Sequence, residues 1–261
     1  MRCLLPLALF ATGCLDYGKL GEGFCTTALS SGRAACDDYE NDTLDAALWR
    51  PNVVGGTLLT ERYASGRRSF SQRLKSGSYN DPDYAYRGRG VLHASLPPDI
   101  AADAQLEYLP PPGGPVAAGS PSDFQPIGVR FFFWVGDSVS PGSYDLVRFL
   151  DAGGKVQRTV SVENGATRVT DNATGTTELQ GSQLSPSAWH CMEVDSYAHK
   201  LDVLTDFRQT NQLVQSLSAL TPLDGLASIE LGPSRATTGQ GAVDIWFDET
   251  IIDASFVGCD P

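Results

Sequence analysis

The sequence predicts an all-β fold made of two packed antiparallel sheets. From Cys36 onward, short apolar runs alternate with turn signals, and no segment has the periodicity of an amphipathic helix. Only 19% of the residues are charged, whereas Gly, Pro, Ser and Thr are frequent, as is typical of chains with many turns and short strands. A sheet that no helix covers buries its apolar face against a second sheet, which favours a sandwich.

The clearest strands are expected at residues 127–135, 144–150, 155–162, 189–197, 201–207, 227–231 and 242–252. Between two pairs of these runs, Asp151-Ala-Gly-Gly and Glu163-Asn-Gly each predict a hairpin turn, because Gly and Asn accept a positive φ. The proline-rich run that begins at Leu109 cannot be a central strand, because proline has no N–H to donate. Strand-like runs flank it, so we interpret it as an insertion within one domain.

Period-two alternation assigns the faces of the strands. In the last strand, Val243, Ile245 and Phe247 share the face that is predicted to be the core. The run 127–135 carries bulky apolar residues on both sides, so it is expected to be central and covered on both faces. His190 is expected to be a core-facing, hydrogen-bonded histidine.

The first thirteen residues have the layout of a secretory signal, because Arg2 precedes a short apolar run. That run is too short to span a bilayer, which needs about 20 apolar residues. Ala11-Thr-Gly-Cys14 follows and resembles the lipobox of bacterial lipoproteins, which implies that Cys14 receives the lipid. Leu is commoner than Ala11 at its position, and a plain secretory signal is the alternative.

We therefore expect a signal peptide at residues 1–13, a flexible tether at 14–35 and a jelly-roll domain at 36–261. Leu15 after the cysteine resembles an outer-membrane address, so the expected location is the bacterial cell envelope, anchored to the outer membrane. Loss of the signal takes the formal charge from −12 to −13 because Arg2 leaves with it. An acidic surface of this kind argues against a nucleic-acid partner and against charge-driven binding of anionic lipid.

Setting aside Cys3 and Cys14 leaves an even set of cysteines: Cys25, Cys36, Cys191 and Cys259. In an exported chain this set suggests two disulfides, and the alternative of a metal site lacks a Cys-x-x-Cys pair. The favoured pairing is Cys25–Cys36 with Cys191–Cys259. The rival is Cys36–Cys259, which would tie the first strand to the end of the chain.

Several segments, in order along the domain, resemble one known superfamily. The opening from Cys36 to Trp49 and the segment 64–70 resemble the start of jelly-roll carbohydrate-binding modules, and 246–252 resembles their closing strand. The pair of runs between residues 189 and 206 resembles the central hairpin of laminin-G-like and pentraxin domains. Together they resemble the concanavalin A-like lectins and glucanases, which implies a jelly roll whose first and last strands lie side by side.

The resemblance also implies a place for carbohydrate. The concave sheet of such folds presents aromatic rings that stack on sugars, with Arg and carboxylate groups that hold hydroxyls. The candidate ligand-binding residues are Arg130, Trp134, Arg148, Trp189 and Glu193. The alternative for the tryptophans is that they fill the core or pack under a loop.

A structural calcium between the first and last strands is a further implication, because related jelly rolls often hold one there. The implied ligands are Asp38, Glu40 and Asp248, since hard cations bind several oxygens. The alternative is an acidic surface on an acidic protein.

No catalytic residue is assigned. Glucanases of this superfamily use Glu-x-Asp-x-Glu on one strand, and Glu193-Val-Asp195 begins that way but lacks the closing Glu. The leading hypothesis is a non-catalytic lectin-like domain that binds carbohydrate or an envelope protein. The alternatives are a polysaccharide-cleaving enzyme of the same fold, either a glycoside hydrolase or a lyase, and a structural or adhesion module with no small ligand.

Overall fold

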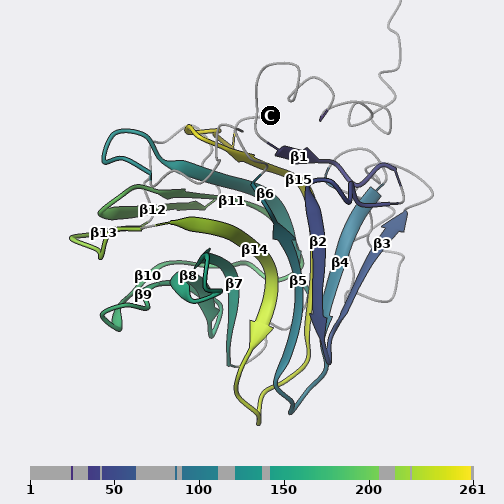
Figure 1. Cartoon of the computed structure of the whole chain (residues 1–261). Coiled ribbons are helices and arrows are strands. Elements are labelled where there is room, and N and C mark those ends of the chain that lie inside the picture. The colour runs from purple at the N-terminus through teal and green to yellow at the C-terminus, as the bar shows by residue number, and fades with distance from the viewer. Residues whose placement is uncertain are drawn as a thin grey trace, which may run out of the picture.

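The computed structural model describes Cys25 and residues 35–41, 43–62, 86, 90–110, 121–136, 142–205, 215–223 and 225–259. Fifteen strands in this part of the chain form two antiparallel sheets packed as a sandwich. The predicted all-β, concanavalin A-like jelly roll is therefore confirmed (Figure 1). The signal peptide and Cys14 lie outside the described residues. No helix in the described ranges is long and apolar enough to cross a membrane.

Sheet A has eight strands in the order β13–β12–β11–β6–β15–β4–β3, with β1 paired to β15. Their bounds are β1 (Ala35–Asp37), β3 (Thr57–Arg62), β4 (Gly90–Leu96), β6 (Ile127–Val135), β11 (Ala188–Ser196), β12 (Lys200–Thr205), β13 (Gln215–Ser218) and β15 (Val243–Asp253). The first and last strands lie side by side as predicted, because Ala35 pairs with Ile252.

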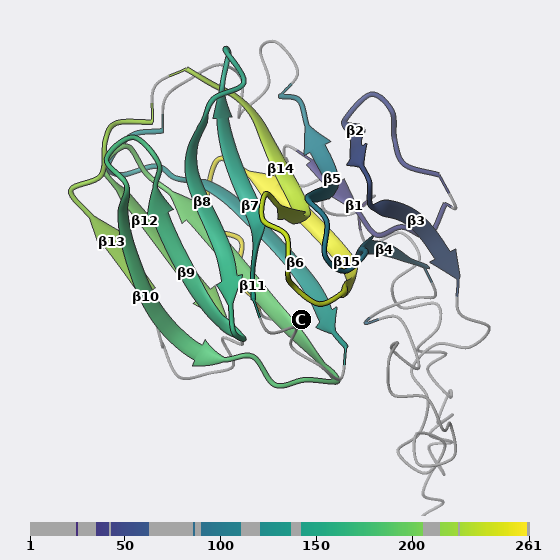
Figure 2. The same cartoon turned by 90° about the horizontal axis from the view of Figure 1, so that it is seen from below.

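Sheet B has seven strands in the order β10–β9–β8–β7–β14–β5–β2. Their bounds are β2 (Trp49–Val54), β5 (Ala102–Tyr108), β7 (Ser143–Asp151), β8 (Val156–Glu163), β9 (Ala166–Asp171), β10 (Thr176–Gln183) and β14 (Leu226–Arg235). Figure 2 shows β10, β9, β8, β7 and β14 next to one another in front of sheet A. Sheet B curves, and its hollow side is turned away from sheet A (Figure 1).

The seven expected strands are present as β6, β7, β8, β11, β12, β14 and β15, with ends that differ by a few residues. The remaining strands were not among those expected. Edge strand β2 shows the reason, since it contains Pro51 and is mostly exposed, so it lacks an alternating apolar face. The predicted hairpin turns join β7 to β8 and β8 to β9, and Gly154, Asn164 and Gly165 all have positive φ.

The core lies between the sheets and includes the predicted face of the last strand, with Val243, Ile245 and Phe247 all buried. Strand β6 is central in sheet A and buried along its whole length, as expected from its two apolar faces. His190 is buried, and its Nε2 lies 2.8 Å from the Ser185 carbonyl oxygen, so the interpretation of this residue is also confirmed.

Two disulfides close the domain in the favoured pairing. Cys25 bonds to Cys36 with a Cα–Cα distance of 5.2 Å, and Cys191 bonds to Cys259 with a Cα–Cα distance of 5.9 Å. The rival Cys36–Cys259 pairing is therefore excluded. One bridge fixes the chain entering β1, and the other fixes the chain leaving β15.

Candidate functional site

The structure divides the five predicted ligand-binding residues between opposite faces of the sandwich. Arg130 and Trp134 on β6, and Trp189 and Glu193 on β11, alternate with core residues and so lie on the outer face of sheet A. Arg148 on β7 lies between core residues of sheet B and so occupies the other outer face. The five residues do not form one site.

Aromatic packing covers part of the outer face of sheet A. The ring of Tyr86 stacks on Phe132 with a centroid distance of 3.6 Å, and Trp189 meets Trp134 edge to face at 6.0 Å. Trp134 and Trp246 are both buried there. Trp134 is thus packed among neighbouring side chains, Trp189 is partly buried, and the role of both in ligand binding stays a prediction.

The C-terminal segment covers Glu193 on the same face. The Glu193 carboxylate accepts hydrogen bonds from the backbone N–H groups of Val257 and Gly258, at 2.5 and 2.7 Å, and its side chain is fully buried. Burial, together with the charges of Glu193 and Asp202, raises the pKa of Asp195 to about 8. The strand that resembles the glucanase motif thus holds its carboxylates under the C-terminal segment.

An ionic cluster lies near the β3 edge of sheet A. His93 Nδ1 is 2.7 Å from a Glu61 oxygen and Nε2 is 3.1 Å from an Asp244 oxygen, while the imidazole stacks on Trp246 at 4.2 Å. Burial by itself would lower the pKa of His93. The hydrogen bonds to Asp244 and Glu61 outweigh it and raise the pKa to about 9.

This cluster predicts a pH-dependent contribution to stability. The folded pKa of His93 lies above the unfolded value near 6.5, so the contribution is complete below about pH 6.5 and is lost as the pH rises through about 9. We expect His93→Gln to destabilise the domain at pH 6 by about 1 kcal/mol, a modest figure because Glu61 and Asp244 are partly exposed. The difference from the unsubstituted protein should shrink at pH 10 in urea unfolding. A difference that stays constant with pH would contradict this.

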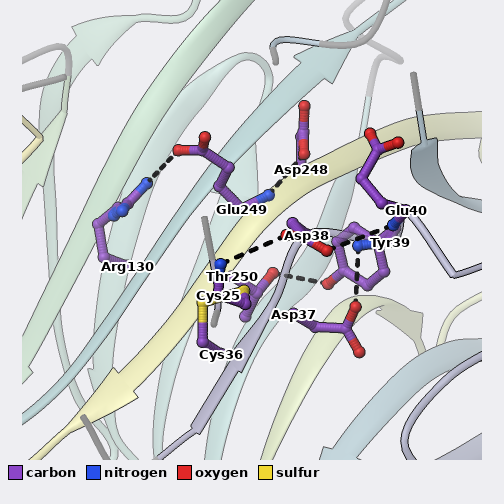
Figure 3. The surroundings of a disulfide bond; sticks show 10 residues. All are labelled: Cys25, Cys36, Asp37, Asp38, Tyr39, Glu40, Arg130, Asp248, Glu249 and Thr250. Atoms are coloured by element: carbon purple, nitrogen blue, oxygen red, sulfur yellow. Dashed lines mark hydrogen bonds and ion pairs between the residues drawn. A yellow bond between two sulfur atoms is a disulfide. The ribbon is translucent and has the colours of Figure 1, made fainter. Parts of the chain in front are cut away.

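The predicted calcium ligands lie near the first and last strands. Figure 3 shows Asp38 and Glu40 after β1, and Asp248 on β15. Asp38 accepts a hydrogen bond from the Cys25 N–H at 3.3 Å, Glu40 accepts one from the Gly90 N–H at 2.7 Å, and Asp248 accepts one from the next backbone N–H at 2.8 Å. Within the described ranges, no group of three or more His, Cys, Asp or Glu side chains is arranged to hold a metal ion. These carboxylates accept hydrogen bonds from the backbone and so stabilise the local fold, and the calcium site stays a prediction.

The outer face of sheet B carries a row of polar side chains that crosses every strand. Strand register alone places them side by side, because each residue pairs with the next across a strand boundary. The row is Thr177, Thr170, Thr159, Arg148, Glu230, Glu107 and Arg50. A second row, parallel to the first, runs through Arg168, Ser161, Asp145, Ser234 and Asp103.

Arg148 connects the two rows. Its Nε is 2.9 Å from a Glu230 oxygen, and a terminal nitrogen donates to Gln105 and lies 3.4 Å from Asp103. Asn52 donates to the other Glu230 oxygen at 2.8 Å. These contacts join residues far apart in the sequence and hold planar polar groups in fixed orientations on the hollow side of the sheet.

The electrostatics of this face are acidic. Carboxylates outnumber guanidinium groups in the two rows: Asp103, Glu107, Asp145 and Glu230 against Arg50, Arg148 and Arg168. Burial raises the pKa of Asp145 to about 6, although Arg148 opposes the shift. The described rows contain no aromatic ring, so this face is suited to hydrogen bonding rather than to stacking.

A pocket of about 190 Å³ opens at one end of sheet B. Its lining includes Asp151, Lys155, Gln157 and Asp171. Gln157 precedes Thr159 by two residues on β8, so the pocket adjoins the first polar row. It adds both donors and acceptors to the face.

Of the side chains on this face, only Arg148 was predicted from the sequence as a binding residue. Its main partners belong to β5 and β14, where β5 was not among the expected strands and β14 was expected to be shorter. Alternation of polar and apolar residues in 102–108 is the signal that could have located part of the row.

No protein-family model matches the chain, and no curated protein matches it. Among solved structures, the "cellulose induced protein, Cip1" aligns with 12% identity and a TM-score of 0.58, covering 87% of this chain and 100% of that one. The binding domain of botulinum neurotoxin serotype D/C aligns with 8% identity and a TM-score of 0.54, covering 88% of this chain.

The chain spans about half the length of the neurotoxin chains, since 50% of the serotype D/C binding domain is covered. A neurotoxin DC binding domain solved in complex with SialylT matches similarly, with 8% identity and a TM-score of 0.51. At these identities the likeness shows the fold alone, which is a two-sheet antiparallel β-sandwich.

Proposed function

We propose that this chain is a lipid-anchored protein of the bacterial cell envelope whose sandwich domain binds carbohydrate on the outer face of sheet B. The observation that carries the proposal is the pair of polar rows centred on Arg148. Side chains fixed by ion pairs and cross-strand contacts lose little further entropy when they bind a ligand. A face pre-organised in this way suits the many hydroxyl groups of a sugar chain.

The chemistry of the face favours neutral saccharides. Arg50, Arg148 and Asn52 offer N–H donors, and the carboxylates offer acceptors, which together match hydroxyl groups that both donate and accept. The excess of carboxylates disfavours polyuronates, because like charges repel. The side chain of Arg50 is 63% exposed and that of Asp103 is 31% exposed, so both are accessible from solvent.

The similar structures support a sugar ligand by analogy. One neurotoxin of type C depends for cell entry on two ganglioside molecules, and its alignment covers 89% of this chain and 50% of that chain. Cip1 is described as cellulose induced. Because one fold hosts many functions, the contacts of Arg148 and its neighbours support the proposal more directly than the likeness does.

Lipid attachment at Cys14 is part of the proposal. The support is the apolar run followed by Ala11-Thr-Gly-Cys14, together with two disulfides that use the other cysteines of the mature chain. Mass spectrometry of the native protein should find an N-terminal peptide that begins at an acylated Cys14. A peptide that begins elsewhere would remove the anchor from the proposal and leave the binding face unaffected.

Asp103→Ala is expected to weaken glycan binding about ten-fold, because a charge-assisted hydrogen bond is worth about 1.5 kcal/mol. The assay is a panel of neutral polysaccharides and polyuronates, with binding expected among the neutral ones. Asp244→Ala is the matched control, since Asp244 is an exposed carboxylate on the outer face of sheet A. Equal losses in both variants, or binding confined to polyuronates, would contradict the assignment.

The same panel separates the alternative functions. Release of reducing ends from any bound polysaccharide would favour a degrading enzyme of the same fold. Failure to bind every member would favour a structural or adhesion module.

A further inference from the structure

We propose that the end of the sandwich carrying Phe124 and Phe256 rests on the surface of the bilayer that holds the acylated Cys14. The inference rests on the lipid anchor proposed above and adds the orientation of the domain. The partner of this end is a lipid surface.

Two phenylalanines at this end are exposed. Phe124 is 96% exposed and Phe256 is 50% exposed, whereas most other aromatic residues in the described ranges are buried. The turn that presents Phe124 is built by hydrogen bonds, because Ser122 Oγ accepts from the N–H groups of Phe124 and Gln125 at 3.3 and 2.9 Å. An ordered turn that exposes a large aromatic side chain to water has an energetic cost unless an apolar partner covers it.

The two phenylalanines lie on adjoining segments. Gln125 Nε2 donates to the carbonyl oxygen of Ala254 at 3.2 Å, which joins the turn before β6 to the chain after β15. Gly128 at the start of β6 lies against the backbone of Ser255, since a Cβ there would meet the Ser255 oxygen at 2.7 Å. The start of β6 and the end of β15 therefore form one surface.

The anchored end of the chain enters the domain beside this surface. Ala35 pairs with Ile252 in the last strand, and Val257 packs against the Cys25–Cys36 disulfide. From Cys14 to Cys25 the chain has eleven peptide steps, which reach at most about 40 Å. The lipid therefore keeps Cys25, at this end of the domain, within about 40 Å of its attachment point.

The opposite end offers a matched control. Asp244 is the second residue of β15 and Asp253 is its last, nine residues or about 30 Å apart. Asp244 pairs with Ser95, which pairs with Thr57 in the turn region between β2 and β3. Val54 in that region is 60% exposed and lies far from the anchor.

The charge near Phe124 and Phe256 determines which lipid headgroups this end can contact. Asp123 lies next to Phe124, and its carboxylate is 2.9 Å from His199 Nδ1. Without the signal peptide the chain carries a formal charge of −13, so anionic headgroups would repel the domain. Contact should therefore come from the phenylalanine rings at the interface of a zwitterionic bilayer, where a second weak contact supplements a lipid anchor.

The test uses acylated full-length protein in phosphatidylcholine–phosphatidylethanolamine vesicles. One variant carries Phe124→Trp and the other carries Val54→Trp, and mass spectrometry of each sample first establishes acylation of Cys14. After the emission of the unsubstituted protein, with its four tryptophans, is subtracted, the tryptophan added in Phe124→Trp should be quenched by brominated acyl chains and shifted to the blue. The tryptophan added in Val54→Trp should behave as it does in water.

Acylated samples in which neither added tryptophan is quenched would overturn the orientation, as would equal quenching of both. Either result would leave the lipid anchor standing, because acylation is measured separately. If mass spectrometry finds no acyl chain, the lipid anchor is refuted. If the added tryptophan of such a non-acylated sample is still quenched, this end of the domain binds lipid by itself.

Discussion

Replacing Arg158 with methionine is expected to lower the free energy of unfolding by about 3–5 kcal/mol, the largest effect that we anticipate for a single side chain. Arg158 is 1% exposed and lies on the core side of β8, at the end of the space between the sheets. Methionine has a similar length and keeps the apolar contacts. The loss therefore measures the hydrogen bonds of the guanidinium group.

Those bonds connect the two sheets. Arg158 donates to Ser196 Oγ at 2.7 Å, to the Thr221 carbonyl at 2.9 Å, and to carbonyls of Tyr197 and Ala198 in the turn between β11 and β12. Burial lowers the pKa of Arg158 to about 10, while Asp171 opposes the shift, so the group is charged at neutral pH. Without it, several buried carbonyls lose their donor, at about 1–3 kcal/mol each before relaxation.

Chemical denaturation of matched variants tests this role. Arg50→Met is the control, because Arg50 also pairs with a carboxylate but is largely exposed, and its loss should cost less than about 1 kcal/mol. The loss of stability in Arg158→Lys should lie between the losses in Arg158→Met and Arg50→Met, since an ammonium has fewer donors than a guanidinium and a different geometry. Comparable effects for Arg158→Met and Arg50→Met would show that the buried contacts do not stabilise the domain.

Removal of the Cys191–Cys259 disulfide is expected to destabilise the domain by about 4 kcal/mol in the loop-entropy model, because the bridge closes a loop of 68 residues. The double variant Cys191→Ser with Cys259→Ser also frees the segment that donates to Glu193. The Glu193 carboxylate would then lose the two N–H groups that satisfy it in the buried site. Both effects act in the same direction.

The other bridge provides the control. Cys25–Cys36 closes a loop of 11 residues, so Cys25→Ser with Cys36→Ser should cost about 3 kcal/mol in the same model. Thermal unfolding of the two double variants compares their stabilities directly. We expect the variant without the Cys191–Cys259 bridge to melt at the lower temperature. The reverse order would mean that neither loop length nor the Glu193 contacts govern the effect.

Local patterns predicted much of the fold. Alternation along 127–135 and 242–252 identified strands β6 and β15 with their core faces, and the Gly and Asn turns identified two hairpins. The disulfide pairing also followed the sequence prediction. Edge strands such as β2 were missed, because an exposed strand with a proline has no apolar alternation to detect.

The binding residues predicted from the sequence differ from those of the site proposed on sheet B. Of the five residues proposed for binding, only Arg148 lies on the polar face of sheet B, and the aromatic ones pack on sheet A. Arg148 contacts Gln105, which is 43 positions away, and Asn52 contacts Glu230 across 178 positions. No local pattern contains such pairings.

The sequence by itself determined that the chain forms strands, which side of the main strands is apolar, and that four cysteines are available for bridges. These properties depend on neighbours one or two positions apart, because side chains alternate along a strand. The tertiary structure alone decided which strands pair and in which register, and so which polar side chains form the rows around Arg148. The physical reason is that register comes from burial of the whole sandwich, and a shift by one residue would turn Arg148 into the core.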